Sequence, residues 1–112
     1  MIQTKRVYDE REPGDGRRLL VMRYWPRGVR KTQVDAWQRE LAPSAELIKA
    51  FKAGKLSWPE FAVRYRREMR LQGAAITALR AAARHTTITL LCGCPDEAHC
   101  HRGLLRRLIA RC

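Results

Sequence analysis

The residue types best suited to chemistry stand together near the C-terminus, in the segment Cys100-His101-Arg102. The apolar residues that follow recur at helical spacing, so we predict that a helix begins near Cys100. The first turn of a helix carries free backbone N–H groups and the positive end of the helix dipole, which together bind anions. Arg102 would add a bidentate donor, and the same field would favour the thiolate form of Cys100. We therefore predict an anion site in which Cys100 and His101 are the catalytic pair.

The structural alternative is that Cys100 is a small buried residue and His101 a capping or core side chain. The known cysteine loops do not decide the question. A phosphatase loop has a cysteine, five residues and an arginine, and a sulfur-transfer loop has a cysteine, four residues and an arginine. Counted from Cys92 or Cys94, neither spacing ends on an arginine. The sequence thus indicates an anion site without naming its reaction.

Zinc is another ligand to consider, since Cys92, Cys94 and Cys100 with either His99 or His101 supply the right donor atoms. The gap between the first two cysteines is one residue instead of the usual two or more, and no distant second ligand pair is present. We expect no metal and no cofactor. A metal-stabilised or purely structural protein is kept as an alternative.

A second group of candidate ligands is the turn Arg23–Gly28, which contains the sequence WPRG. It follows a predicted strand and should lie at the same edge of a parallel sheet as the C-terminal segment. We expect Arg23, Arg27 and Arg102 to bind one anion, with Trp25 as a stacking wall for a ring. The alternative is a tight turn whose Trp25 packs into the core.

Two other polar groups have simpler explanations. Asp96 and Glu97 could orient the imidazole of His99 or act as a base, but we favour a helix N-cap for Asp96. The arginines between residues 64 and 70 form one side of a predicted helix. Such a side is usually just solvated, although it could contact the backbone of a nucleic acid.

The elements that must position these groups can be read from the apolar pattern, which predicts strands at residues 2–8, 18–24 and 86–92. The long helical connection between the second and third strands favours a parallel pairing. We predict one α/β domain spanning residues 1–112, small and three-layered, with a short, mainly parallel sheet flanked by helices.

Helices are expected between and after these strands. Helical spacing predicts a short helix at residues 32–39 and another from Ser44 to Gly54. Ser57 and Glu60 form a capping box that starts a long helix, which is interrupted near Gly73 and continues to residue 84. The final helix follows Cys100.

The composition is that of a packed but strongly basic protein. The chain has 112 residues, 46% of them hydrophobic, and a formal charge of +12. Such a charge favours anionic ligands and polyanions, although the arginine and alanine richness of GC-rich genomes explains it as well. No apolar run is long enough to span a bilayer and the N-terminus has no apolar signal core, so we expect a cytoplasmic protein with reduced cysteines.

Several segments together resemble one family. The sequences WPRG (25–28) and LAPS (41–44), the spacing of Trp58, Phe61 and Tyr65, and TLL (89–91) before a histidine-containing loop look like the domain of unknown function 488 family, in its YeaO-like branch. Cys92 and the Cys100-His101-Arg102 segment resemble motifs of other branches. The resemblance covers nearly the whole chain and implies a small α/β fold, without an established activity.

This chain departs from the resembled branch at two positions. Met22 stands where that branch tends to carry an aspartate, and Ile48 stands where it tends to carry an arginine. A mechanism that needs both of those charges is therefore not expected here.

Our leading hypothesis from the sequence is a protein that binds, and in one version processes, a phosphate-bearing ligand such as a nucleotide. Arg23, Arg27, Trp25 and Arg102 would hold the ligand. The alternative hypothesis is a protein that associates with nucleic acid and has no catalytic activity. Neither hypothesis involves a membrane.

Overall fold

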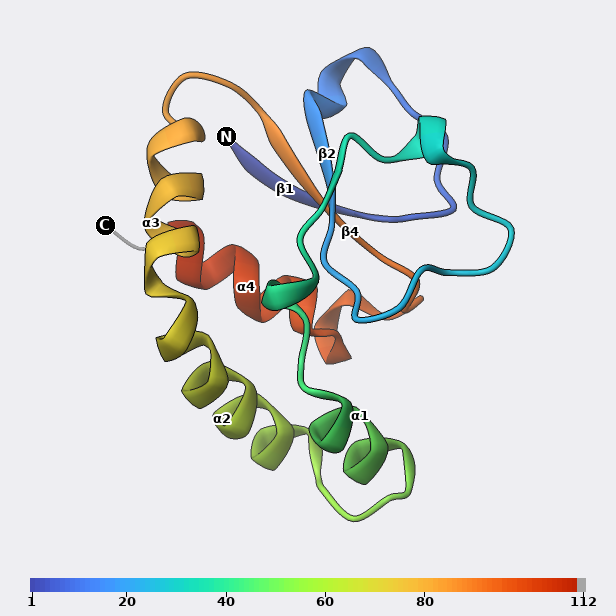
Figure 1. Ribbon diagram of the computed structural model, residues 1–112, viewed down its shortest axis with the longest axis vertical. Coiled ribbons are helices and arrows are strands. Elements are labelled where there is room, and N and C mark those ends of the chain that lie inside the picture. The colour runs from blue at the N-terminus through green and yellow to red at the C-terminus, as the bar shows by residue number, and fades with distance from the viewer. Residues whose placement is uncertain (111–112) are drawn as a thin grey trace.

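A parallel four-stranded sheet forms the centre of the computed structural model, which describes residues 1–110 without the side chain of Glu97 (Figure 1). The strands are β1 (Ile2–Arg6), β2 (Arg17–Leu20), β3 (Ala36–Trp37) and β4 (Ile88–Cys92), in the order β1-β4-β2-β3. Every neighbouring pair is parallel. The last strand in sequence therefore lies in the middle, which requires the long helical connection that precedes it.

Four α-helices lie on one side of this sheet. They are α1 (Ala45–Lys52), α2 (Trp58–Met69), α3 (Gly73–Ala82) and α4 (His101–Ala110). Helix α4 packs directly against β1 and β4, and α2 and α3 pack against α4. The core residues of all four helices belong to one cluster with Leu19 of β2, with Ile88 and Leu90 of β4, and with Val21, which directly follows β2. Because side chains alternate along a strand, these residues point to the same face of the sheet.

The opposite face is covered by long loops with short 3-10 turns. Leu20 and Leu91 point to this side, where Met22, Trp25 and Trp37 pack against them. The three layers are thus α-helices, sheet and loops. None of the described helices is both long and apolar enough to cross a membrane.

The small α/β fold with a parallel sheet and helices is confirmed, as are the three predicted strands and the capping box of Ser57 and Glu60. The helices lie on one side of the sheet only, and loops cover the other side. The helix predicted for residues 32–39 is wrong. That segment contains a 3-10 turn at Lys31–Gln33 and then β3, which extends the sheet beside β2. Pairing with β2 satisfies the backbone groups there, and it outweighs a weak helical pattern.

One hydrogen-bonded link fixes α1 against α2. The carboxylate of Glu68 accepts from the backbone N–H of Ser44 at 2.8 Å and from its hydroxyl at 2.5 Å. The same hydroxyl caps α1 by accepting from the N–H of Leu47. This link holds the helix that forms one wall of the cavity described below.

We predict that Glu68→Gln lowers the free energy of unfolding by about 1–3 kcal/mol, because the charge is lost and one of the two acceptor oxygens at a half-buried helix cap becomes an NH₂ group that cannot accept. Chemical denaturation measures the change. Glu40→Gln is the control, since Glu40 lies exposed on a 3-10 turn. Equal effects of the two substitutions would contradict the role assigned to Glu68.

Candidate functional site

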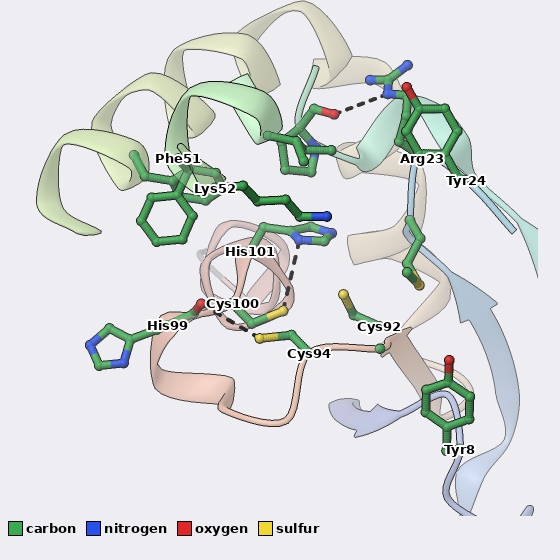
Figure 2. A pocket seen from close by; sticks show the side chains of 15 residues that line it. Tyr8, Arg23, Tyr24, Phe51, Lys52, Cys92, Cys94, His99, Cys100 and His101 are labelled. Atoms are coloured by element: carbon green, nitrogen blue, oxygen red, sulfur yellow. Dashed lines mark hydrogen bonds between the residues drawn. The ribbon is translucent and has the colours of Figure 1, made fainter. Parts of the chain in front are cut away.

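A cavity of about 520 Å³ lies at the carboxyl edge of the sheet (Figure 2). The central strand β4 ends there at Cys92, residues 93–99 form a loop, and α4 begins directly after Cys100. Residues that follow β1 and β2 reach the same place, as does the last turn of α1. This is the edge at which open parallel sheets commonly bind ligands.

Two sulfurs and one imidazole form the floor of the cavity. Cys92, Cys100 and His101 are all buried, and their ligand atoms lie within 4.8 Å of one another. All three line the cavity. We call this group the sulfur–imidazole cluster. Its members come from the end of β4 and the start of α4, so the packing of that strand and helix creates it.

A hydrogen bond to the neighbouring strand segment orients His101. Its Nε2 lies 2.6 Å from the carbonyl oxygen of Val21, so Nε2 carries the proton and donates it. The other ring nitrogen, Nδ1, lies 4.0 Å from the sulfur of Cys100. The ring also meets that of Tyr65 edge-on, with centroids 5.5 Å apart. His101 therefore presents Nδ1 to the sulfurs.

The pKa values of the two cysteines of the cluster shift in opposite directions. A hydrogen bond from Cys100, with help from His101 and Arg102, lowers the pKa of Cys92 to about 5 against the cost of burial. The bond to Cys92 raises the pKa of Cys100 instead. This direction is opposite to the lowered Cys100 pKa expected from the helix N-terminus, because the neighbouring sulfur of Cys92 and burial both oppose a charge on Cys100.

Arg102 lies behind this floor. Its side chain is buried and donates through Nη1 to the carbonyl oxygen of Cys94 at 2.6 Å, and to the sulfur of Cys100 at 3.5 Å. Its Nε finds no hydrogen-bond partner among the described residues. Arg102 is not among the lining residues, so it acts on the cluster as a nearby positive charge and anchors the loop after β4.

Two cations stand at other parts of the cavity wall. Arg23 lines it and donates to the carbonyl oxygens of Pro43 and Ala42, which ties the end of β2 to the segment before α1. Lys52 is exposed at the end of α1, and Figure 2 shows it extending over the cavity. Each of them can supply a positive charge to a bound anion.

Aromatic rings make up much of the remaining wall. Tyr8 and Tyr24 follow the ends of β1 and β2, while Phe51 and Phe61 come from α1 and α2. The rings of the two phenylalanines lie 4.7 Å apart between centroids. Such walls suit a ligand that has a flat apolar part.

The predicted ligand residues of the turn Arg23–Gly28 do not all reach the cavity. Arg23, which precedes it, joins the cavity, whereas Trp25 and Arg27 do not line it. Trp25 packs edge-on against Trp37 at 5.4 Å and donates to the carbonyl oxygen of Val29. Arg27 is exposed. The structure thus brings together Arg23, Cys100 and His101 of the predicted site residues, and leaves Trp25 and Arg27 apart.

His99 forms a separate pair at the cavity mouth. Its Nδ1 lies 2.7 Å from a carboxylate oxygen of Asp96, whose other oxygen accepts from the N–H of Ala98. The hydrogen bond to His99 lowers the pKa of Asp96. Asp96 therefore both caps the 3-10 turn Glu97–His99 and orients the imidazole, while the ring of His99 points away from the sulfurs (Figure 2).

Sequence reasoning missed two contributors. Cys92 was considered as a zinc ligand and as the start of a cysteine loop whose spacing fails, but it was not among the predicted site residues, although a cysteine that ends a wholly apolar strand signals a reactive group at the sheet edge. Lys52 had no distinguishing local signal, because it is one of several lysines near α1. Only the folded structure shows which of these lysines lines the cavity.

Comparison with known proteins places these features in a family. Residues 2–112 match the family model DUF488-N3a, described as "Active DUF488-N3 subclade". The chain is 38% identical over 106 residues to the uncharacterized protein YeaO of Escherichia coli, covering 93% of this chain and 92% of that protein. It is 34% identical over 110 residues to the uncharacterized protein Rv3073c of Mycobacterium tuberculosis, covering 96% of this chain and 92% of that protein. No solved structure gives a significant match.

We predict that Cys100→Ala slows alkylation of Cys92 by iodoacetamide about tenfold or more at pH 6. Loss of the Cys100 donor raises the pKa of Cys92, and once that pKa passes 7 less than about a tenth of the sulfur is thiolate at pH 6. Mass spectrometry of the labelled peptide from reduced, metal-free protein gives the rate. Cys100→Ser keeps a hydroxyl donor, so Cys92 should be alkylated faster in this variant than in Cys100→Ala. Equal rates in the alanine variant and the unsubstituted protein would refute the assignment.

Proposed function

The chain belongs to the DUF488 family, and we propose that it binds a small phosphate-bearing ligand, such as a nucleotide, in the cavity at the carboxyl edge of its sheet. One observation carries the proposal. A single cavity has cations on its wall, aromatic rings around it and the sulfur–imidazole cluster on its floor. A charged, ring-bearing ligand would use all three.

The charges near the cavity support an anionic ligand. Arg23 and Lys52 lie on its wall, and Arg102 lies behind the cluster at its floor. No acidic side chain is found among its lining residues. A guanidinium and an ammonium group on the wall of one cavity are well suited to phosphate oxygens.

The walls support a ligand with a ring. Tyr8, Tyr24 and Phe51 offer faces or edges on which a base could stack. Met22 and Ile48, the two positions at which this chain departs from the branch it resembles, both line the cavity as well. They make this part of the wall apolar, which favours contact with a base or sugar over contact with further charge.

The cluster supports processing of the ligand in addition to binding. Cys92, Cys100 and His101 face the space that the ligand would occupy. A cysteine with an adjacent imidazole is a common nucleophilic pair. The description of the matched subclade as active is consistent with a chemical role for these groups.

A second candidate function is association with a nucleic acid. Four arginines of α2 and its end are exposed, and the formal charge of the whole chain is +12. The exposed residues are Arg64, Arg66, Arg67 and Arg70. This function predicts an affinity that falls steeply with salt and is lost when these arginines are replaced.

We predict that Lys52→Ala weakens binding of a nucleotide or simpler phosphate ester at least about tenfold, because a charge-assisted contact contributes about 1.5–3 kcal/mol. A thermal-shift screen of nucleotides and phosphate esters finds the ligand, and calorimetry measures its affinity. Lys49→Ala is the matched control, since Lys49 lies exposed on the same helix but does not line the cavity.

Equal loss in the Lys52 and Lys49 variants would count against the cavity as the binding site. If no phosphate-bearing compound binds, while an oligonucleotide binds in a salt-dependent way that requires the α2 arginines, the second candidate function is correct instead.

A further inference from the structure

We propose that Cys92, Cys100 and His101 form a binding site for one Zn²⁺ ion, with a fourth coordination position that opens into the cavity. This proposal goes beyond the ligand-binding function and does not depend on it. It follows from the donor atoms, their spacing, the orientation of the imidazole and the position of the cluster.

The donor set is the one that zinc prefers. Two thiolates and one imidazole are common ligands of tetrahedral zinc, with Zn–S distances of about 2.3 Å and Zn–N distances of about 2.0–2.1 Å. A tetrahedron of that size separates two sulfurs by about 3.8 Å and a sulfur from a nitrogen by about 3.6 Å. The three ligand atoms here already lie within 4.8 Å of one another, and Cys100 Sγ is 4.0 Å from His101 Nδ1. Small side-chain rotations would close the remaining gap.

The imidazole is prepared for a metal by its second hydrogen bond. Zinc-binding histidines usually donate their other ring N–H to a carboxylate or a backbone carbonyl, which fixes the tautomer and the ring plane. His101 does this through Nε2 to the carbonyl oxygen of Val21 at 2.6 Å. The lone pair of Nδ1 is thereby directed to the side of the sulfurs. This bond is an observation independent of the cysteine spacing.

The surroundings of the sulfurs also suit a metal thiolate. Arg102 donates toward the sulfur of Cys100 at 3.5 Å, the kind of outer contact that supports a metal-bound sulfur. The three ligands are buried, which limits competition from water. Zinc binds cysteine as the thiolate, so the thiol protons of the site pass to solvent on binding, and two thiolates then balance the charge of one Zn²⁺ ion.

The number of protein ligands indicates the type of site. Structural zinc is almost always held by four protein ligands, whereas catalytic zinc has three and keeps one position for water or substrate. The described part of the chain offers three here, and each of them lines the cavity. A phosphate oxygen or a water molecule entering the cavity would thus reach the open position.

Cys94 lies near but outside this group. Its sulfur is 3.5 Å from the carbonyl oxygen of Asp96 and 3.9 Å from that of His99, and it does not belong to the cluster. It follows Cys92 by two positions and is less buried. Cys94→Ser is therefore a matched control for replacement of the cluster cysteines.

The test is direct titration of reduced, metal-free protein with Zn²⁺ in the absence of any phosphate compound. We expect one Zn²⁺ per chain, and affinity about 100-fold weaker in each of Cys92→Ser, Cys100→Ser and His101→Gln. Cys94→Ser should bind as the unsubstituted protein does. Binding of less than one equivalent by the unsubstituted protein, or equal loss in Cys94→Ser, overturns the proposal.

Titration with Co²⁺ keeps the test valid if a variant fails to fold. The unsubstituted protein should give the intense visible bands of tetrahedral cobalt and a near-ultraviolet sulfur-to-cobalt band, and Zn²⁺ should remove both. Weak octahedral bands without the sulfur band overturn the proposal. Lys52→Ala should leave both titrations unchanged, so failure of the phosphate-binding function can be told apart from failure of the zinc site.

Discussion

The parallel pairing of β4 between β1 and β2 determines where every group of the site lies. In this register Cys92 stands opposite Arg6 of β1, and Leu91 stands opposite Leu20 of β2. The three strands therefore end side by side, and the residues after each of them meet at one edge. Moving β4 to a sheet edge would separate Cys92 from one of the two segments that complete the cavity wall.

A few buried polar contacts then convert this edge into a defined site. His101 joins α4 to the end of β2 through Val21, and Arg102 joins the same helix to the loop after β4 through the carbonyl oxygen of Cys94. A buried polar group without a partner is costly, so these contacts favour one orientation of the start of α4. That orientation places the sulfur of Cys100 beside the sulfur of Cys92 and gives the two thiols unlike proton affinities.

Much of the fold could be predicted because its signals are local. The apolar run that ends at Cys92 and the capping box at Ser57 each depend on neighbours within a few residues. The strand at Ala36–Trp37 could not be predicted in the same way. It is two residues long, and it exists because β2 offers unpaired backbone groups beside it, which is a contact between distant parts of the chain.

The sequence by itself determined the fold class, the family and the presence of a chemically capable segment at residues 100–102. These depend on residue type and short-range spacing, which the linear order contains. Only the tertiary structure decided that Cys92 and Lys52 join this segment while Trp25 and Arg27 do not. It also decided that the pKa values of Cys92 and Cys100 shift in opposite directions, because proton affinity depends on the hydrogen bonds and charges that folding brings near each sulfur.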